Sequence, residues 1–199
     1  MTAAVFVDRD GVLNELVTDS VSGRPESPLD SRQVVLIPGA AAALKRLRKA
    51  GYVIVGVSNQ PAAAKGTVSM EQLESVQARV LELLEQAGAA PDAFRVCFHH
   101  PDGVIPGLGG ACDCRKPGPG MLLDAAAEMN LNLETSWMIG DTDADILAGA
   151  AAGCRTVLIE NPASKHKRGG EVRPDAFAAD LTTAAELVIS SGQPQPGSR

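Results

Sequence analysis

Two aspartates near the start of the chain, Asp8 and Asp10, are the residues best suited to do chemistry. They directly follow a short apolar run at 3–7, and Gly11 comes next. Two carboxylates one residue apart need a cation to keep both ionised, and beside bound Mg²⁺ the first could attack an electrophile while the second transfers protons. In the alternative interpretation, Asp8 caps a loop and Asp10 with Gly11 forms an ordinary turn. The motifs further along the chain favour the catalytic interpretation.

Polar side chains also follow two later apolar runs. Ser58 and Asn59 come directly after the run at 52–57, where they could hold phosphate oxygens or form a simple turn. Asp141 follows the run at 136–140. Its carboxylate could complete an oxygen-rich Mg²⁺ shell with the first two aspartates.

Two close pairs of metal-ligating residues flank a loop rich in glycine and proline. Cys97 and His99 precede this loop, and Cys112 and Cys114 follow it. Three thiolates and one imidazole are a complete tetrahedral Zn²⁺ ligand set, so the spacing predicts a structural zinc that orders a loop with little apolar material of its own. His100 could replace His99, and spacing alone does not decide between them. The alternative is a set of unrelated thiols.

Arg115 and Lys116 come immediately after the second cysteine pair. If zinc fixes the cysteines, these two cations are held in place for a phosphoryl group; otherwise they are ordinary surface bases. The polar connection at 15–33 is expected to lie over the mouth of the site. The basic, glycine-rich segment at 161–174 could fold over a phosphate, although its composition favours a solvated loop.

Strands and helices must alternate to position these residues. Apolar runs predict strands at 3–7, 52–57, 94–98, 136–140 and 156–159, and amphipathic or capped segments predict helices at 38–50, 69–87, 121–129, 143–152 and 181–190. Ser69 and Gln72 have the spacing of a capping box. At the start of the helix at 143–152, at least one of Asp143 and Asp145 is expected to act as a cap. The predicted fold class is α/β, with a Rossmann-like, doubly wound parallel sheet.

Length, composition and charge limit the kinds of partner. We expect one domain at 1–190 and a disordered tail at 191–199. A formal net charge of −6 and a pI near 5.1 argue against nucleic acid or a membrane surface as a partner. The sequence shows no signal peptide and no apolar stretch of membrane-spanning length, so we expect a cytoplasmic protein whose cysteines are reduced or metal-bound. We also expect a monomer.

Four short motifs, in order, resemble those of the haloacid dehalogenase (HAD)-type phosphatases between about residues 5 and 159: Asp8-Arg9-Asp10-Gly11, Ser58-Asn59-Gln60, Arg115-Lys116-Pro117 and Gly140-Asp141. The cysteine pairs and the adjoining Arg-Lys-Pro add a resemblance to the D-glycero-D-manno-heptose 1,7-bisphosphate 7-phosphatases and the closely related histidinol-phosphate phosphatases. The resemblance implies the HAD fold without a large cap domain, in which a zinc-stabilised loop insertion at 97–114 helps to shape substrate choice.

The resemblance also implies a role for each candidate. Asp8 would be the nucleophile that forms an aspartyl-phosphate, and Asp10 the general acid and base. Mg²⁺ would be held by Asp8, the backbone carbonyl of Asp10, and Asp141. Four further residues would bind the phosphoryl group or the substrate: Ser58, Lys116, Asn59 and Arg115.

The implied activity is hydrolysis of a phosphorylated sugar, most closely heptose 1,7-bisphosphate at C7. The alternatives are a histidinol-phosphate phosphatase, another small phosphomonoesterase, or a zinc-stabilised binding protein that keeps a relic site. Two departures from the family pattern lie near the expected substrate. The segment at 61–66 reads Pro-Ala-Ala-Ala-Lys-Gly where Ser-Gly-Ile-Ala-Arg-Gly is frequent, and Thr142 follows Asp141 where a lysine is common.

Overall fold

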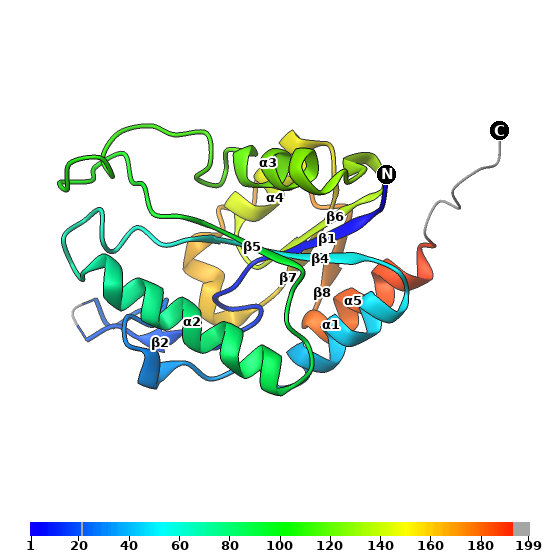
Figure 1. Ribbon diagram of the computed structural model, residues 1–199, viewed down its shortest axis with the longest axis horizontal. Helices are drawn as coiled ribbons and strands as arrows, with labels where there is room; N and C mark the ends of the chain where they lie inside the picture. Colours follow the sequence, from blue (N-terminus) through cyan, green and yellow to red (C-terminus); the bar gives the residue numbers. More distant parts are fainter. Residues whose placement is uncertain (21, 193–199) are drawn as a thin grey trace.

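The apolar runs form a six-stranded parallel sheet, in the order β5-β4-β1-β6-β7-β8, in the computed structural model of the chain, which describes residues 1–20 and 22–192 (Figure 1). All five pairings between neighbouring strands are parallel. The strands are β1 (Ala4–Val7), β4 (Val53–Asn59), β5 (Ala93–Cys97), β6 (Trp137–Gly140), β7 (Arg155–Ile159) and β8 (Ala176–Ala178). The predicted α/β parallel sheet is thereby confirmed. The short β8 was not predicted.

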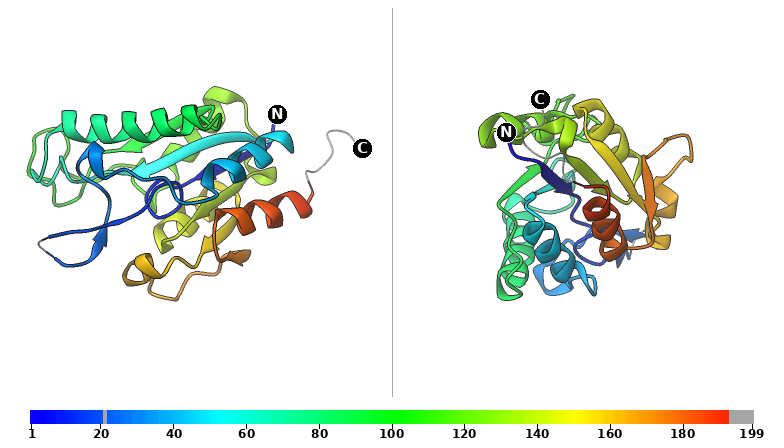
Figure 2. Two further views of the ribbon diagram at one scale, coloured as in Figure 1. Left: turned by 90° about the horizontal axis from the view of Figure 1, so that it is seen from below. Right: turned by 90° about the vertical axis from the view of Figure 1, so that its right-hand side faces the viewer.

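Helices cover both faces of the sheet, as Figure 2 shows. Successive side chains of a strand point to opposite faces. Val5 therefore belongs to a core with Leu44, whereas the next residue, Phe6, belongs to a second core with Leu122. The first core is completed by α1 (Ala40–Lys49), α2 (Met70–Gln86) and α5 (Leu181–Ser190), and the second by α3 (Gly120–Met129) and α4 (Asp143–Ala152).

Local capping chemistry sets the start of two helices. Ser69 and Gln72 form the predicted capping box of α2, in which each side chain bonds the other residue's backbone N–H. Thr142 and Asp145 form a second capping box at α4, so Asp145 is the predicted acidic cap. These bonds satisfy N–H groups that an α-helix leaves unpaired in its first turn.

The long connections lie at the carboxyl edge of the sheet. The segment between β1 and α1 contains the two-stranded ribbon of β2 (Val17–Thr18) and β3 (Pro25–Glu26) and the short helix η1 (Ser31–Gln33). Two further 3-10 helices are η2 (Leu133–Thr135) and η3 (Pro162–Lys167). Within residues 1–20 and 22–192, no separate cap domain occurs and no helix is long and apolar enough to cross a membrane. The expected tail lies, from residue 193 onward, outside the described residues.

Strand register brings the polar residues of the motifs together. Val7 of β1 pairs with Gly56 of β4 on one side and with Ile139 of β6 on the other. Because parallel strands end at the same edge, the residues that follow these three positions in the chain meet there. Ser58 and Asn59 are the last residues of β4 and belong to the strand, so the simple turn considered for them does not form.

Candidate active site and metal centres

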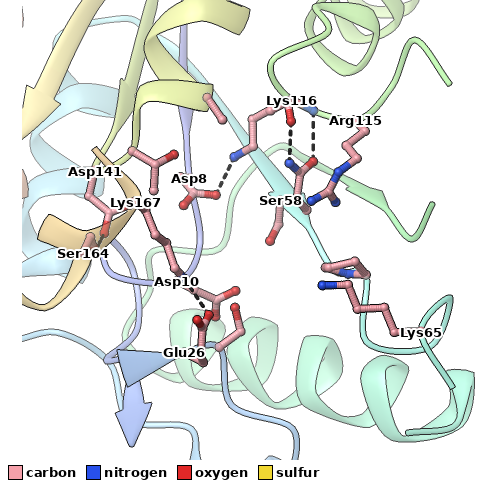
Figure 3. A pocket seen from close by; sticks show the side chains of 15 residues that line it. Asp8, Asp10, Glu26, Ser58, Lys65, Arg115, Lys116, Asp141, Ser164 and Lys167 are labelled. Carbon is pink, nitrogen blue, oxygen red and sulfur yellow. Dashed lines mark hydrogen bonds and ion pairs between the residues drawn. The ribbon is translucent and has the colours of Figure 1, made fainter. Parts of the chain in front are cut away.

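A cavity of about 300 Å³ opens where β1, β4 and β6 end (Figure 3). Its charged side chains come from segments far apart in the sequence. The cavity is lined by all seven residues predicted to act on substrate or to bind Mg²⁺: Asp8, Asp10, Ser58, Asn59, Arg115, Lys116 and Asp141. The fold therefore brings the four sequence motifs to one place.

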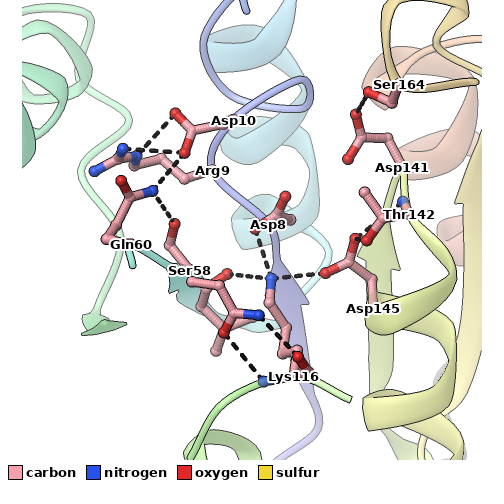
Figure 4. Close-up of polar contacts among 12 residues, drawn as sticks. Asp8, Arg9, Asp10, Ser58, Gln60, Lys116, Asp141, Thr142, Asp145 and Ser164 are labelled. Atoms are coloured by element: carbon pink, nitrogen blue, oxygen red, sulfur yellow. Dashed lines mark hydrogen bonds and ion pairs between the residues drawn. The ribbon is translucent and has the colours of Figure 1, made fainter. Parts of the chain in front are cut away.

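The ammonium group of Lys116 lies at the centre of this site (Figure 4). Its Nζ is 2.6 Å from Asp8 Oδ1 and 2.6 Å from Asp145 Oδ1, and it donates a hydrogen bond to the Val57 carbonyl at 2.9 Å. Burial by itself would lower the pKa of Lys116, but the charges of Asp145 and Asp8 outweigh burial and raise it. The side chain therefore stays protonated although it is almost fully buried.

Asn59 fixes the backbone of this lysine. Its amide donates to the Lys116 carbonyl at 2.9 Å and accepts from the Lys116 N–H at 3.0 Å. Both ends of the Asn59 amide are thus used to hold Lys116. Besides the predicted role of Asn59 in placing the substrate, this contact gives it a role in positioning Lys116. The pairing of Asp145 with Lys116 was missed, because its place at a helix start already gave it a capping role.

Three buried carboxylates lie close together, and two of them are paired with the lysine. Oxygens of Asp8, Asp141 and Asp145 all lie within 4.8 Å of one another. Burial, together with the charge of Asp145, raises the pKa of Asp8 to about 7, and burial with the charges of Asp8 and Asp145 raises the pKa of Asp141. Asp141 Oδ1 is buried without a hydrogen-bond partner in the described part of the chain. One lysine does not neutralise three acids, so these residues fit a divalent cation with oxygen ligands.

Asp10 is held differently from Asp8. Arg9, which is completely buried, donates to both Asp10 oxygens at 3.1 and 3.0 Å, and Asn14 and Gln60 each donate to the same carboxylate. Burial by itself would raise the pKa of Asp10, but the arginine and the hydrogen bonds outweigh it and lower the pKa. The donors keep the carboxylate ionised and fix its direction. Sequence reasoning missed the role of Arg9, whose only local signal is a charge beside the aspartates.

A close backbone approach places the loop after β1 against Asp141. Gly11 has a φ of 86°, and a Cβ atom built on it would lie 2.1 Å from Asp141 Oδ2. Only glycine tolerates both this conformation and this proximity. Ser164 donates a hydrogen bond to the same Asp141 oxygen, and Asn161 donates to the Gly11 carbonyl at 2.9 Å. The position of Asp141 is thus set from two sides.

The expectation that 161–174 forms a solvated loop is wrong for its first half. Besides the contacts of Asn161 and Ser164, Arg168 donates to the Ile159 carbonyl at 3.1 Å and the Gly169 N–H donates to Asp143 at 2.6 Å. Lys167 lines the cavity. The composition of the segment suggested a solvated loop, but most of these contacts are made to residues more than 20 positions away, which a local pattern does not reveal.

The four predicted zinc ligands form a second cluster. The sulfur atoms of Cys97, Cys112 and Cys114 are 3.1–3.6 Å apart, and His99 Nδ1 is 3.4 Å from Cys114 Sγ. Tetrahedral zinc with Zn–S bonds of about 2.3 Å needs similar spacings, about 3.8 Å between sulfurs. All three cysteines are free thiols. His100 is not in the cluster: its Nδ1 accepts from the Asp102 N–H. The cluster can therefore hold one metal ion, with His99 as its nitrogen ligand.

The loop that carries this cluster contacts two cationic segments of the cavity. Arg115 Nη1 donates to the His99 carbonyl at 3.3 Å. On its far side, the N–H groups of Val104 and Ile105 donate to the Ala64 carbonyl at 2.8 and 3.2 Å, next to Lys65. These hydrogen bonds connect the loop to Arg115 and to the neighbour of Lys65. Both cations line the cavity.

Comparison with known proteins places the chain in a class of hydrolases. A profile of the HAD-hydrolase-like family matches residues 113–184. The D,D-heptose 1,7-bisphosphate phosphatase of B. bronchiseptica, whose crystal structure contains magnesium and phosphate, superimposes with a TM-score of 0.76 at 29% identity, over 96% of this chain and 99% of that one. The predicted HAD fold is confirmed.

Two curated relatives belong to one group of phosphatases within this class. The D-glycero-beta-D-manno-heptose-1,7-bisphosphate 7-phosphatase of Rhodopseudomonas palustris is 37% identical over 150 residues, which are 75% of this chain and 79% of the relative. The D-glycero-D-manno-heptose-1,7-bisphosphate 7-phosphatase of Thermosynechococcus vestitus is 36% identical over 200 residues, covering 96% and 98%. This chain accordingly belongs to the HAD phosphatase family that contains the heptose 1,7-bisphosphate 7-phosphatases.

The raised pKa of Asp8 predicts a pH-dependent stability when no divalent cation is present. The pKa of Asp8 is about 7 in the folded protein and 3.8 for an ordinary aspartate, so the folded state binds more protons than the unfolded state between these values. Stability should therefore fall as the pH rises from about 4 to about 7. Added Mg²⁺ should raise the melting temperature more at about pH 8 than at about pH 5.

Thermal unfolding of protein desalted into magnesium-free buffer measures this effect. Asp8→Asn removes one titrating group and a proposed Mg²⁺ ligand, and should therefore weaken both dependences; the raised pKa of Asp141 leaves a smaller pH dependence in place. Asp124→Asn, which changes an exposed aspartate of α3, serves as the matched control and should leave them as in the parent. Equal Mg²⁺ stabilisation of the parent at both pH values would contradict the account of the acid cluster.

Proposed function

We propose that the protein is a Mg²⁺-dependent phosphatase that hydrolyses a sugar bisphosphate through an aspartyl-phosphate, and that its substrate is D-glycero-D-manno-heptose 1,7-bisphosphate, cleaved at C7. One observation carries the proposal. An oxygen of Asp8 lies 2.6 Å from the Lys116 ammonium, at a cavity that Asp141 also lines. A buried carboxylate is thereby held next to a fixed cation, where it can accept a phosphoryl group.

Asp8, the Asp10 carbonyl and Asp141 would hold the Mg²⁺. The bound ion supplies positive charge that offsets the repulsion between an anionic phosphate and the carboxylates. Lys116 and Ser58 orient the phosphoryl oxygens, and a carboxylate oxygen of Asp8 attacks phosphorus as the bond to the sugar oxygen breaks. Asp10 protonates that departing oxygen, then takes a proton from the water that attacks the aspartyl-phosphate, and inorganic phosphate leaves.

Asp10 must gain a proton before it can donate one. Arg9 and the amide donors hold it ionised in the free protein. An entering phosphate brings negative charge close to this carboxylate, and repulsion between like charges raises its pKa. Substrate binding would therefore favour the protonated form of Asp10 only when a leaving group is in place.

Two further cations in the cavity favour a bisphosphate over histidinol phosphate. Arg115 and Lys65 line the cavity away from the Asp141 side, as Figure 3 shows. Arginine and lysine side chains suit a second phosphate, and Arg115 can bind its oxygens with two parallel hydrogen bonds. Histidinol carries a positively charged amine, which these side chains would repel. Lys65 lies in the segment at 61–66, which departs from the family pattern. It is therefore the residue of that segment that we expect to contact the second phosphate.

Asp8→Asn tests the mechanism. The substitution keeps size and removes the nucleophile, so kcat should fall roughly 10⁴-fold while the circular dichroism spectrum stays that of the folded parent. Phosphate release from heptose 1,7-bisphosphate with added Mg²⁺ is the measurement, and Asp124→Asn again serves as the matched control. Turnover by Asp8→Asn close to the parental rate would exclude the aspartyl-phosphate route.

The same assay with a substrate panel tests the substrate. The parent should show a kcat/KM for heptose 1,7-bisphosphate well above its value for histidinol phosphate. Arg115→Met should raise KM for the bisphosphate, because it removes a cation proposed to bind the second phosphate. A preference for histidinol phosphate would overturn the substrate assignment while leaving the reaction type in place.

We also propose that Cys97, His99, Cys112 and Cys114 bind a structural Zn²⁺. The support is the clustering of four ligand atoms in a loop with few apolar residues. With four protein ligands the metal has no open position, so it would stabilise the loop and, through it, Arg115.

Substituting one ligand tests the zinc proposal. Cys112→Ser should lower both the zinc content measured by mass spectrometry and the melting temperature. It should also raise KM, because the loop would then hold Arg115 less firmly. Cys154→Ser is the matched control, because Cys154 is buried in the core and burial raises its pKa to about 12. This variant should retain the zinc content of the parent. A full complement of zinc in Cys112→Ser would refute the assignment of the ligands.

A further inference from the structure

An ion pair bridges two walls of the cavity beside the proposed acid, Asp10. Lys167 Nζ lies 2.8 Å from Glu26 Oε2, and His166 Nε2 lies 3.5 Å from Glu26 Oε1. Lys167 belongs to η3 and Glu26 to β3, segments more than 130 residues apart. The Lys167 side chain is 29% exposed and that of Glu26 43%. Both residues line the same cavity as Asp8 (Figure 3), so they are accessible to a bound molecule.

Contacts on each side fix this pair relative to the reacting groups. Ser27, the neighbour of Glu26, forms a side-chain hydrogen bond with Asp10. Ser164, on the same short helix as Lys167, is completely buried and donates to Asp141. The pair is therefore anchored to the proposed general acid at one end and to a proposed Mg²⁺ ligand at the other. Because the pair and Asp10 line the same cavity, a leaving group bound there would lie near the pair.

We infer that Glu26 and Lys167 form a subsite for the hydroxyl groups of the leaving sugar, and so act as specificity residues. This inference rests on the proposed function. A hydroxyl both donates and accepts hydrogen bonds, whereas a carboxylate only accepts and an ammonium only donates. An ion pair can thus bind neighbouring hydroxyls without being broken.

Charge favours hydroxyls over a second phosphate at this position. Glu26 would repel a phosphate there, and Lys167 is already paired with it. Arg115, on the opposite side of the cavity, instead donates to a backbone carbonyl and lines the cavity with Lys65. The second phosphate would lie on that side, and the carbon chain with its hydroxyls between the two sides. The cavity thereby specifies an orientation of the leaving group.

The test compares substrates with and without hydroxyls in the leaving group. The measured quantity is the ratio of kcat/KM for heptose 1,7-bisphosphate, or for mannitol 1-phosphate, to kcat/KM for p-nitrophenyl phosphate. Lys167→Met and Glu26→Gln should each lower this ratio by about 10- to 100-fold, since loss of a hydrogen bond to a charged group is typically of that size. Lys167→Arg keeps a donor and should restore much of the ratio.

Lys165→Met is the matched control. It removes the same charge from the same short helix, but Lys165 is exposed and does not line the cavity, so the ratio should stay within about twofold of the parent. Parental ratios in both Lys167→Met and Glu26→Gln would overturn the subsite, and so would equal losses on all substrates, which indicate a structural role. A parent protein that does not cleave heptose 1,7-bisphosphate would contradict the proposed function, which is a separate outcome. In that case the ratio measured with mannitol 1-phosphate still shows whether Glu26 and Lys167 bind hydroxyl groups.

Discussion

The buried ammonium of Lys116, held between Asp8 and Asp145, is the interaction on which the arrangement of the site depends. Removing such a cation would leave several carboxylates buried without a counter-charge, which is strongly destabilising. Lys116 lies 108 residues from Asp8 in the sequence, so the contact forms only when the sheet and the loop before α3 are both in place. A charge balance of this kind would link folding of the domain directly to assembly of the site around the proposed nucleophile.

Other parts of the molecule set the position of this lysine and its acidic partners. Asn59 holds its backbone, and a metal ion bound by the cysteine and histidine cluster would order the loop that precedes it. On the other side of the cavity, Ser164 orients Asp141. The segments at 15–33, 61–66 and 161–169 do for this small domain what a separate cap does in larger enzymes: they contribute Glu26, Lys65 and Lys167 to the walls of the cavity. Substrate choice would depend on these segments more than on the sheet.

Much of this architecture could be predicted from the sequence. Apolar runs of strand length, the capping box at Ser69 and the paired cysteines are local signals, and the parallel sheet follows from alternation of strands and helices. Residues placed directly after a strand could be assigned to the site because parallel strands share one edge. The short strand β8 could not be predicted, because it has only three residues and one of them, Phe177, is exposed. Its sequence therefore lacks the pattern of a buried strand. The roles of Asp145 and Lys167 were not predicted because tertiary contacts bring their partners, Lys116 and Glu26, to them. The role of Arg9 was not predicted because a charge next to two aspartates is not a distinctive pattern.

The central claim is that one divalent cation is shared between the ends of β1 and β6, beside the Lys116 ammonium. Diffraction from crystals soaked in Mn²⁺ tests it most directly, since the anomalous signal locates the ion without reference to activity. The account predicts a peak within coordination distance, about 2.0–2.5 Å, of carboxylate oxygens of both Asp8 and Asp141, with Lys116 still paired with Asp145. A peak that contacts only one of these two carboxylates, or an ion that replaces the lysine beside Asp145, would contradict it.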